Sequence, residues 1–480
     1  MNAVAPDPRR WKALILICTA IFVVVLDIAI VNVALPTIQH DLHFAEQNLQ
    51  WVITAYGLTY GGFLLLGGRA ADLIGRRIVF MTGLAIFGAA SLVCGLSSSS
   101  GMLIAARGVQ GFGAAIVTPA ALSIISVTFT EGSERNKALG AWGAVGGSGA
   151  AAGVLMGGVL TKYLGWEWIF WVNVPVAVIV LILTPIYVRE SRREDVVHEY
   201  DLPGAISVTS GLIVLVYAIS EAPQVGWGTF RTIGLLVVSG LLLAFFLWWE
   251  ARAKEPLMPL SIFRIRLVAA ANLGGFLLAG GLYGTFLMLT LYMQQVLHMS
   301  VLQTGVAFLA TAGTAVLMAG PAQALTTRFG AKPVLIFGMS LLVAGCLWYT
   351  QIDADGSYQM DLLPGFVAVG IGIPFSFIPI TIAALAGVSH EKAGLASGLI
   401  NTSQQVGGAI GTAVLSTVFV THSRTLLEER TPPEQALTQG FVWGFWVALG
   451  IWAAGLLAAI FLVRREEVEQ LEAVELPASN

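Results

Sequence analysis

The sequence predicts an all-α protein that crosses a membrane fourteen times, as two six-helix bundles with a helix pair inserted between them. Only 11% of the 480 residues are charged, whereas about 25% is usual for a soluble domain. Hydrophobic residues make up 56% and the mean hydropathy is +0.81, so polar side chains could not cover a soluble globule of this size. Apolar segments of roughly 20 residues, the length of a membrane span, recur along the whole chain.

The charge balance and the absent motifs argue against several other classes of protein. A net charge of −3 gives no basic surface for nucleic acid, and the apolar composition disfavours a soluble enzyme or a disordered chain. Cys18, Cys94 and Cys346 lie in apolar segments without metal-ligand spacing, so we expect buried side chains. Neither G-x-x-x-x-G-K-[ST] nor H-E-x-x-H occurs. We therefore expect no metal, no cofactor and no enzymatic activity.

The apolar segments have the length of membrane-spanning helices. The first follows Arg9, Arg10 and Lys12, as a signal peptide would, but it is too long and lacks a small-residue cleavage pattern, so we expect a retained helix. The seventh and twelfth are the weakest, being short or interrupted by proline. The predicted spans are 12–34, 50–67, 78–96, 102–127, 138–160, 168–188, 203–220, 230–249, 267–293, 304–325, 333–350, 362–386, 394–420 and 441–463.

The distribution of basic residues supports this count. With the N-terminus inside, 20 of the 25 Lys and Arg residues fall on the inner side, 4 on the outer side, and Arg107 within a span. Cytoplasmic loops are normally the basic ones. Because one miscounted helix would move every later loop to the other side, the asymmetry predicts fourteen spans with both termini cytoplasmic.

Polar inner segments on either side of the seventh and eighth spans suggest the domain organisation. The loops at 72–77 and 327–332 each place a glycine before a cation at a short inner turn, which is a weak internal repeat. Paired halves of this kind suggest a transporter with a site near the membrane midplane. We expect an N-terminal six-helix bundle at 1–188, an inserted helix pair with cytoplasmic linkers at 189–266, a C-terminal six-helix bundle at 267–464 and a cytoplasmic tail at 465–480.

The inner loop after the second span carries a specific motif. Residues 68–77 read GRAADLIGRR, in which the glycine permits a tight turn and the cations suit a helix end facing anionic lipid. Ordinary basic flanking of a span is the alternative interpretation. The segment resembles the G-x-L-A-D-R-x-G-R-R signature of the major facilitator superfamily. The resemblance implies an inner gate made of Gly68, Asp72, Gly75, Arg76 and Arg77.

Three further segments extend the resemblance over nearly all of the chain. Residues 26–36 (LDIAIVNVALP) resemble the first helix of the 14-span drug:proton antiporters of that superfamily. Residues 107–113 (RGVQGFG) resemble the R-x-x-Q-G-x-G motif of its fourth helix, and residues 166–175 (WEWIFWVNVP) resemble the start of its sixth. The resemblance implies the major-facilitator fold and a multidrug or antibiotic efflux transporter of the cytoplasmic membrane.

Three positions depart from the motifs of that family. Leu73 and Glu167 each stand where an arginine is usual, and Val154 stands where the antiporter motif of the fifth helix has proline. The glycines around Val154 are retained, but the missing proline weakens the argument for antiport over symport.

Asp27 and Arg107 are the charged residues deep within predicted spans. A carboxylate there costs roughly 2.5–3.5 kcal/mol or more unless it faces protein or water. Burial favours its neutral form, so Asp27 is suited to binding and releasing a proton. Arg107 stays charged and could bias Asp27 or hold a helix contact; a purely structural role is the alternative for both. The resemblance assigns proton coupling and the substrate cavity to Asp27, Asn32, Arg107 and Gln110.

Two helices carry strips of small or polar residues. In the fifth span, Gly149, Gly153, Gly157 and Gly158 match the spacing of the antiporter motif, and we favour helix packing over gating for them. Polar residues recur along one face of the thirteenth span, where they must face protein or water. They either line the transport path or hold helices together. The candidates for cavity lining are Asn272, Tyr283, Tyr292, Asn401, Gln404 and Gln405.

Together these features predict a proton-coupled exporter of drug-like or antibiotic amphipathic molecules. We expect it to work by alternating access, as a monomer in the lipid bilayer, with protons as the coupling ion. A proton symporter that imports a small nutrient on the same fold is the first alternative. A membrane receptor without transport is less favoured, because the inner loops are too short for a soluble domain.

Overall fold

The computed structural model of the chain describes residues 9–44, 51–129, 133–191, 201–253, 256, 258, 260–386, 388 and 393–462. This part of the chain is almost entirely helical and contains no strand, so the predicted all-α class is confirmed. Contacts divide the chain into two compact units, residues 1–199 with 388–399 and residues 200–387 with 400–480.

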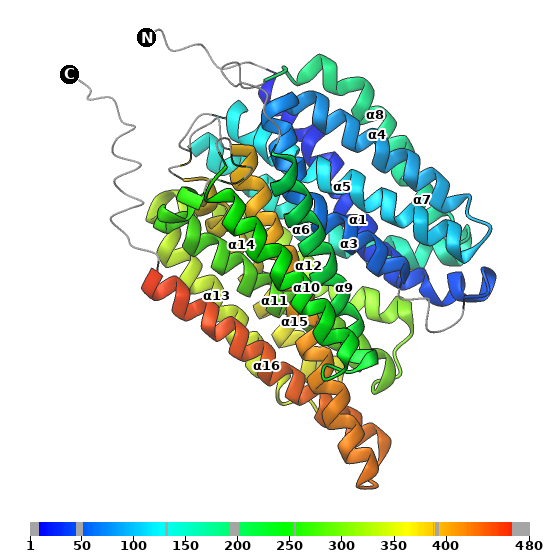
Figure 1. Ribbon diagram of the computed structural model, residues 1–480. Coiled ribbons are helices and arrows are strands. Elements are labelled where there is room, and N and C mark those ends of the chain that lie inside the picture. The colour runs from blue at the N-terminus through cyan, green and yellow to red at the C-terminus, as the bar shows by residue number, and fades with distance from the viewer. Residues whose placement is uncertain are drawn as a thin grey trace. The chain divides into compact units, whose positions relative to one another are not determined.

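In the first unit, the most extensive helix contacts are those made by α5 and those between α1 and α6 (Figure 1). Both α3 and α4 pack extensively against α5, and α8 packs against α4 and α1. Only Val172 separates α7 from α8, and the two together correspond to the sixth predicted span. The helices are α1 (Arg10–Asp41), α3 (Trp51–Ile74), α4 (Arg76–Gly95), α5 (Ser100–Thr128), α6 (Ser133–Tyr163), α7 (Trp168–Trp171) and α8 (Asn173–Tyr187).

The second unit is centred on α14, against which α12 and α13 both pack, while α16 packs against α11 and α13. The first seven residues of α15, 393–399, belong to the first unit and the remainder to the second. The helices are α9 (Leu202–Val225), α10 (Phe230–Glu250), η1 (Leu260–Arg264), α11 (Arg266–Gln295), α12 (Val301–Phe329), α13 (Ala331–Tyr349), η2 (Tyr358–Leu362), α14 (Leu363–Leu385), α15 (Ala393–Glu428) and α16 (Pro433–Leu462).

Two glycines form the short turns that the sequence repeat predicts. Gly75 joins α3 to α4 with φ of 127°, and Gly330 joins α12 to α13 with φ of 81°. Residues with a side chain rarely adopt such positive φ values, so glycine is the natural residue at both turns. The two halves of the chain therefore share this local geometry.

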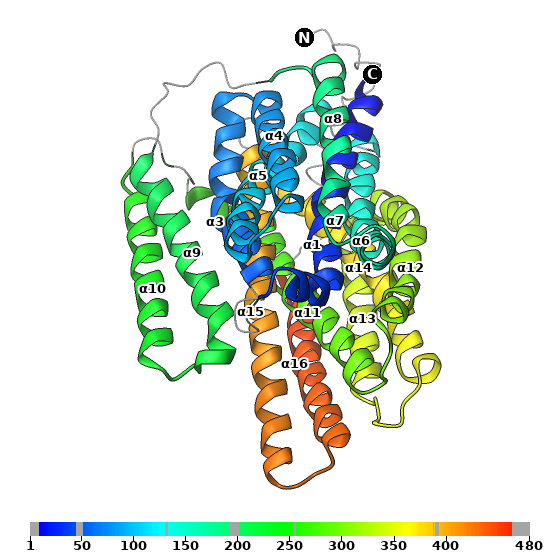
Figure 2. The same ribbon diagram turned by 90° about the vertical axis from the view of Figure 1, so that its right-hand side faces the viewer.

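The helices α9 and α10 lie side by side as an antiparallel pair (Figure 2). Asp201 accepts a hydrogen bond from Gly204 N (2.9 Å) and caps α9, and it also accepts one from Trp249 Nε1 (2.7 Å) at the end of α10. Ser239 Oγ donates to Gly211 O (2.9 Å) midway along the pair. These bonds tie the two helices together at one end and in the middle.

Each of the fourteen predicted spans overlaps a helix, taking α7 and α8 as one. Among the described residues, eleven helices are long and apolar enough to cross a membrane, and α3 is a twelfth if its two parts, which meet at 49°, form one span. The fourteen-span count and the cytoplasmic termini therefore remain predictions. The predicted span 394–420 ends eight residues before α15 does, and the span 441–463 begins eight residues after α16 does. Polar residues beyond an apolar window can continue a helix.

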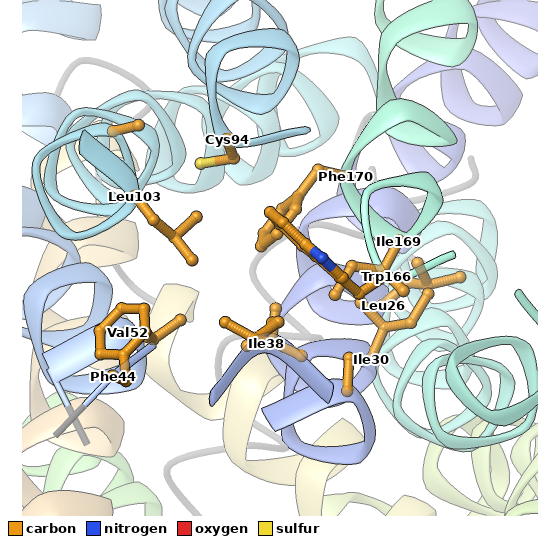
Figure 3. Packing of buried hydrophobic residues seen from close by; sticks show 13 residues of the cluster. Leu26, Ile30, Ile38, Phe44, Val52, Cys94, Leu103, Trp166, Ile169 and Phe170 are labelled. Carbon is orange, nitrogen blue, oxygen red and sulfur yellow. The ribbon is translucent and has the colours of Figure 1, made fainter. Parts of the chain in front are cut away.

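One hydrophobic cluster of the first unit surrounds the middle and C-terminal half of α1. It gathers side chains from α1, α3, α4, α5 and α7, and Figure 3 shows Leu26, Cys94 and Phe170 among them. Leu26 precedes the acid of α1, while Cys94 and Phe170 come from other helices. The cluster therefore lies beside the polar residues of this unit, since Cys94 contacts Gln110 and Phe170 lies near Arg107.

Candidate functional site

The carboxylate of Asp27 lies at the centre of a buried polar network in the first unit. Asp27 is 0% exposed. Its Oδ2 accepts a hydrogen bond from Arg107 Nη1 (2.5 Å). Its Oδ1 accepts from Gln110 Nε2 (2.8 Å) and from Asn173 Nδ2 (2.8 Å). Helices α1, α5 and α8 each supply part of this site.

Arg107 is partnered on several sides, although it is only 1% exposed. Besides Asp27, its Nη1 donates to Gln110 Oε1 (2.6 Å), and its Nε donates to Val52 O (2.9 Å). The guanidinium carbon lies 4.3 Å from the ring centroid of Tyr56 and 5.7 Å from that of Phe170. Both rings lie within cation–π distance. The protein thus replaces the hydration of this cation with a carboxylate, two carbonyl-type oxygens and two aromatic faces.

The two amide side chains at Asp27 differ in how completely they are bonded. Gln110 Nε2 also donates to Ser91 Oγ (2.8 Å), and Gln110 Oε1 accepts from Arg107 and from Cys94 Sγ (3.6 Å). Asn173 Nδ2 has a second, longer contact with Ser91 Oγ (3.5 Å). Asn173 Oδ1 is buried and has no hydrogen-bond partner among the described residues.

The structure brings together three of the four residues predicted for proton coupling, which are Asp27, Arg107 and Gln110. Asn32 lies in α1, but its side chain is outside the described residues. Sequence reasoning assigned no role to Ser91 or Asn173. Asn173 lies in the motif at 166–175, where an amide beside a long apolar segment could have indicated a buried polar site. Nothing in the sequence distinguished Ser91.

The inner-loop residues form a second buried network in the same unit. Asp72 Oδ1 accepts from Arg76 Nη2 (3.0 Å), and Asp72 Oδ2 accepts from Leu395 N (3.1 Å) in the first turn of α15. Arg76 Nε donates to Ser123 Oγ (2.7 Å) on α5. The backbone N–H groups of a first helical turn attract negative charge, so Asp72 joins α3 to the start of α15.

Glu190, which sequence reasoning did not select, holds the other side of this turn. Its carboxylate accepts from Arg77 N (3.0 Å) and Ile78 N (3.0 Å) at the start of α4, and lies 3.7 Å from Arg77 Nε. A Cβ atom at Gly75 would lie 2.8 Å from Glu190 Oε1. Gly75 is therefore required by its backbone conformation, whereas the Glu190 carboxylate is the end of a flexible side chain that could shift. The signal in the sequence was an acid in the polar segment between the sixth and seventh predicted spans.

Among the described side chains, Gly68 of the predicted inner gate and the positions that differ from the family motifs make no polar contact that adds to these networks. Gly68 and Leu73 are buried in α3, so an apolar side chain occupies the place where the family usually has arginine. Glu167 lies at the start of α7. The side chain of Val154 is outside the described residues.

The glycines of α6 face α1 near the polar site. A Cβ at Gly153 would lie 2.7 Å from Leu26 O and 2.8 Å from Ala29 Cβ, and one at Gly149 would lie 3.0 Å from Val25 Cβ. Contacts under about 3 Å do not occur with real side chains, so Gly153 permits the close crossing of α1 and α6, and the contact at Gly149 is tighter than most real ones. Gly157 and Gly158 lie further along α6, buried and half-buried respectively. This geometry favours the packing interpretation.

The polar candidates of the second unit fall into separate places. Asn272 Oδ1 accepts from Ser403 Oγ (2.8 Å), joining α11 to α15. The Tyr283 hydroxyl is hydrogen-bonded to Gln405, and its ring, 42% exposed, packs over Gly408. Tyr292 is not part of this group, because its hydroxyl donates to Asp353 O (2.6 Å) in the loop between α13 and η2.

Two of the remaining candidates sit beside this group on α15. Gln404 is buried, and its Cγ lies 3.3 Å from where a Cβ of Gly275 would be; Asn401 is half-buried.

An apolar groove of about 850 Å³ occurs in the second unit, between α12, α13 and α14. Met318, Pro321, Phe337 and Phe375 line it, together with Lys332, whose ammonium donates to Ile460 O (2.9 Å). None of the predicted site residues lines it, so the groove does not define the candidate site.

The family model described as Major Facilitator Superfamily matches residues 17–412 and, in a second match, residues 272–478. The chain belongs to the major facilitator superfamily. Membership indicates a multi-pass membrane transporter rather than an enzyme. The second match begins in α11, the first α-helix after the α9–α10 pair.

Curated relatives cover most of the chain. It is 41% identical over 459 residues to the puromycin resistance protein pur8 of Streptomyces alboniger, covering 94% of this chain and 90% of that protein. It is 39% identical over 411 residues to the cephamycin export protein CmcT of Amycolatopsis lactamdurans, covering 85% and 84%. It is 35% identical over 412 residues to the tetracenomycin C resistance and export protein of Streptomyces glaucescens, covering 86% and 76%.

A solved structure shows the same fold. The human organic anion transporter MFSD10 (TETRAN) superimposes with a TM-score of 0.67 at 16% sequence identity, covering 94% of this chain and 100% of that chain. At this identity the match concerns the fold alone.

Proposed function

We propose that this transporter exports amphipathic, drug-like or antibiotic molecules across the cytoplasmic membrane in exchange for protons, acting as a monomer. The observation that carries the proposal is the buried Asp27–Arg107 pair. A carboxylate that can change its protonation state, set against a cation that cannot, is the simplest device for coupling a proton to a change of helix packing.

The relatives support export as the direction of transport. Two of them are named for export, and the third for resistance to an antibiotic. The three names refer to three different compounds, so the shared property is an antibiotic-like small molecule rather than one substrate. We propose that the same breadth of chemistry applies to this chain.

The proposed mechanism turns on the charge of Asp27. While Asp27 is ionised, it holds Arg107 together with Gln110 and Asn173. Protonation from the outer side removes the negative charge and weakens the attraction to Arg107. This changes the relative stability of the inward-facing and outward-facing states. A cationic substrate reaching ionised Asp27 would have to compete with Arg107, which would link substrate binding to the same pair.

The inner network gives the mechanism a second element. Asp72 accepts hydrogen bonds from Arg76 and from Leu395 N, so it stabilises the arrangement in which the start of α15 lies against α3. We propose that these contacts hold the inner side closed and break when the inner side opens.

The test uses purified protein in liposomes, with puromycin as the probe and an imposed pH gradient. Asp27→Asn keeps the shape of the side chain but cannot ionise, so pH-driven puromycin transport should fall at least tenfold. Asp41→Asn, at the exposed end of the same helix, is the control and should transport normally. Wild-type rates in Asp27→Asn would refute the assignment.

The direction of the proton movement separates antiport from symport. Addition of puromycin to substrate-free liposomes should move protons opposite to the drug, as seen with a trapped pH dye. Protons moving with the drug would favour the symporter alternative.

A further inference from the structure

Two side-chain amide groups donate to the same oxygen of Asp27, and they differ in how freely each can rotate. Gln110 Nε2 and Asn173 Nδ2 both lie 2.8 Å from Asp27 Oδ1. Because ionised Asp27 only accepts hydrogen bonds, each amide must present its NH₂ group to it. A protonated Asp27 would carry a hydroxyl, which requires an acceptor instead.

Gln110 cannot supply that acceptor while Arg107 is in place. Its Oε1 accepts from Arg107 Nη1 at 2.6 Å and from Cys94 Sγ at 3.6 Å, and its Nε2 also donates to Ser91 Oγ. Turning the amide over would place its NH₂ group against the guanidinium and break several bonds. The arrangement therefore fixes Gln110 as a donor.

Asn173 has no such constraint. Its Oδ1 is buried and has no partner among the described residues, and its second contact, to Ser91 Oγ, is 3.5 Å long. Rotating the amide by half a turn would exchange an unpaired oxygen for an unpaired NH₂ group, at similar cost. A buried unpaired polar atom in a native structure calls for a reason, and an alternating hydrogen-bond role provides one.

We propose that the Asn173 side-chain amide inverts when Asp27 changes protonation state, donating to the carboxylate and accepting from the carboxylic acid. The proton adds to Asp27 Oδ1, and the new hydroxyl donates to Asn173 Oδ1. Arg107 keeps its bond to Asp27 Oδ2. Asn173 is thus a positioning residue that allows Asp27 to bind a proton inside a closed network. The inference rests on the proposed role of Asp27 as the proton site.

The surroundings leave Asn173 as the residue suited to this role. Among the described residues, the charged or titratable groups that face this network are Arg107 from α5, Cys94 from α4 and Tyr56 from α3. Across the α6 contact, Gly149 and Gly153 present no polar side chain. Arg107 cannot accept a hydrogen bond, and the Tyr56 ring packs on Arg107 rather than on Asp27.

The test follows Asp27 directly by infrared spectroscopy on the full-length protein in lipid, without substrate. The carbonyl band of protonated Asp27 is the one that appears at low pH and is absent from Asp27→Asn. In Asn173→Leu, the carboxylate loses a donor, so the pH of half-protonation should rise by about one unit. The carboxylic acid loses its acceptor as well, so its carbonyl band should move to higher wavenumber.

Two further variants are measured together with Asn173→Leu. Asn173→Asp can accept but not donate when ionised, so its midpoint should rise further, and it remains informative if Asn173→Leu does not fold. Thr184→Val removes one buried hydrogen bond of the same helix, from Thr184 Oγ1 to Val180 O, away from Asp27, and should change neither quantity.

The outcomes separate this inference from the proposed function. If the low-pH band is present in wild type and Asp27→Asn alike, Asp27 is not the proton site and both fail. If Asp27 titrates but Asn173→Leu leaves the position of its band unchanged, Asn173 only donates, and the inversion is refuted while the proposed function stands. A raised midpoint together with a shifted band supports the inversion.

Discussion

At the scale of single residues, Arg107 and Asp27 depend on each other for their place in an apolar interior. Each would be costly to bury alone, and their mutual contact is supplemented by Gln110, Asn173 and Val52 O. Such a pair contributes little net stability compared with apolar residues, but removing one partner leaves an uncompensated charge.

Arg107→Ala should therefore destabilise the protein by about 3–5 kcal/mol, because it leaves Asp27 buried without its cation. The double variant Arg107→Ala with Asp27→Asn should recover part of that loss. The measurement is the thermal unfolding midpoint in detergent for both single variants and the double.

Arg231→Ala is the matched control, because its pair with Glu221 has a 56% exposed cation. Exposed pairs contribute little to stability, so this variant should unfold at nearly the wild-type temperature. Strictly additive losses in the Arg107 and Asp27 series would show that the pair is not energetically coupled.

Sequence reasoning found Asp27 and Arg107 because charges deep in apolar spans are rare and therefore informative. It assigned nothing to Ser91 and Asn173, because neutral polar residues are common in membrane helices and serve packing as often as function. Tyr292 was selected with the cavity candidates for the same reason, since a tyrosine in an apolar span does not reveal which loop its hydroxyl reaches.

At the scale of helices, the crossing of α1 and α6 sets the position of Asp27. Leu26, which immediately precedes Asp27, has its carbonyl oxygen 2.7 Å from where a Cβ of Gly153 would be. The atoms in conflict belong to the backbone of α1, which cannot rotate away as a side chain could. The glycine spacing predicted a close contact, but a strip of small residues does not say which helix it meets.

Gly153→Ala should separate α1 from α6 and destabilise the protein by about 1–3 kcal/mol, as overpacked positions do. The measurement is again the thermal midpoint. Gly101→Ala in α5 is the control, because its added Cβ meets nothing within 4 Å, and alanine in a helix should leave stability unchanged or slightly raised. Equal effects of the two substitutions would contradict the role of Gly153 in this crossing.

At the scale of the whole molecule, composition alone predicted a helical membrane protein, and the motifs predicted its family. The number of membrane crossings depends on α3, which is bent, and on α6 and α9, which, within the described part of the chain, are not among the helices with the length and hydropathy of a span. The apolar part of α9, Pro203–Ile219, is short, whereas α10 has the length and hydropathy of a span. Whether a helix of this kind crosses the membrane is not determined by its length and hydropathy, because its depth also depends on the surrounding lipid and protein.

Fourteen spans require the α9–α10 loop and the segment after α10 to lie on opposite sides of the membrane. In a background without native cysteines, Gly228→Cys should react with an impermeant maleimide added to intact cells. Arg252→Cys should react only after the membrane is permeabilised. Arg430→Cys, in the loop before α16, should behave as Gly228→Cys does. Labelling of positions 228 and 252 from the same side would rule out the fourteen-span count.

Cys94 gives the protein a native vibrational reporter. Its thiol lies in the hydrophobic cluster and points at Gln110 Oε1. The S–H stretching band falls where proteins and lipids are otherwise nearly transparent, and its frequency follows the strength of that contact. The movement of Gln110 during a transport cycle can therefore be followed in unlabelled protein, beside the carbonyl band of Asp27 in the same spectrum.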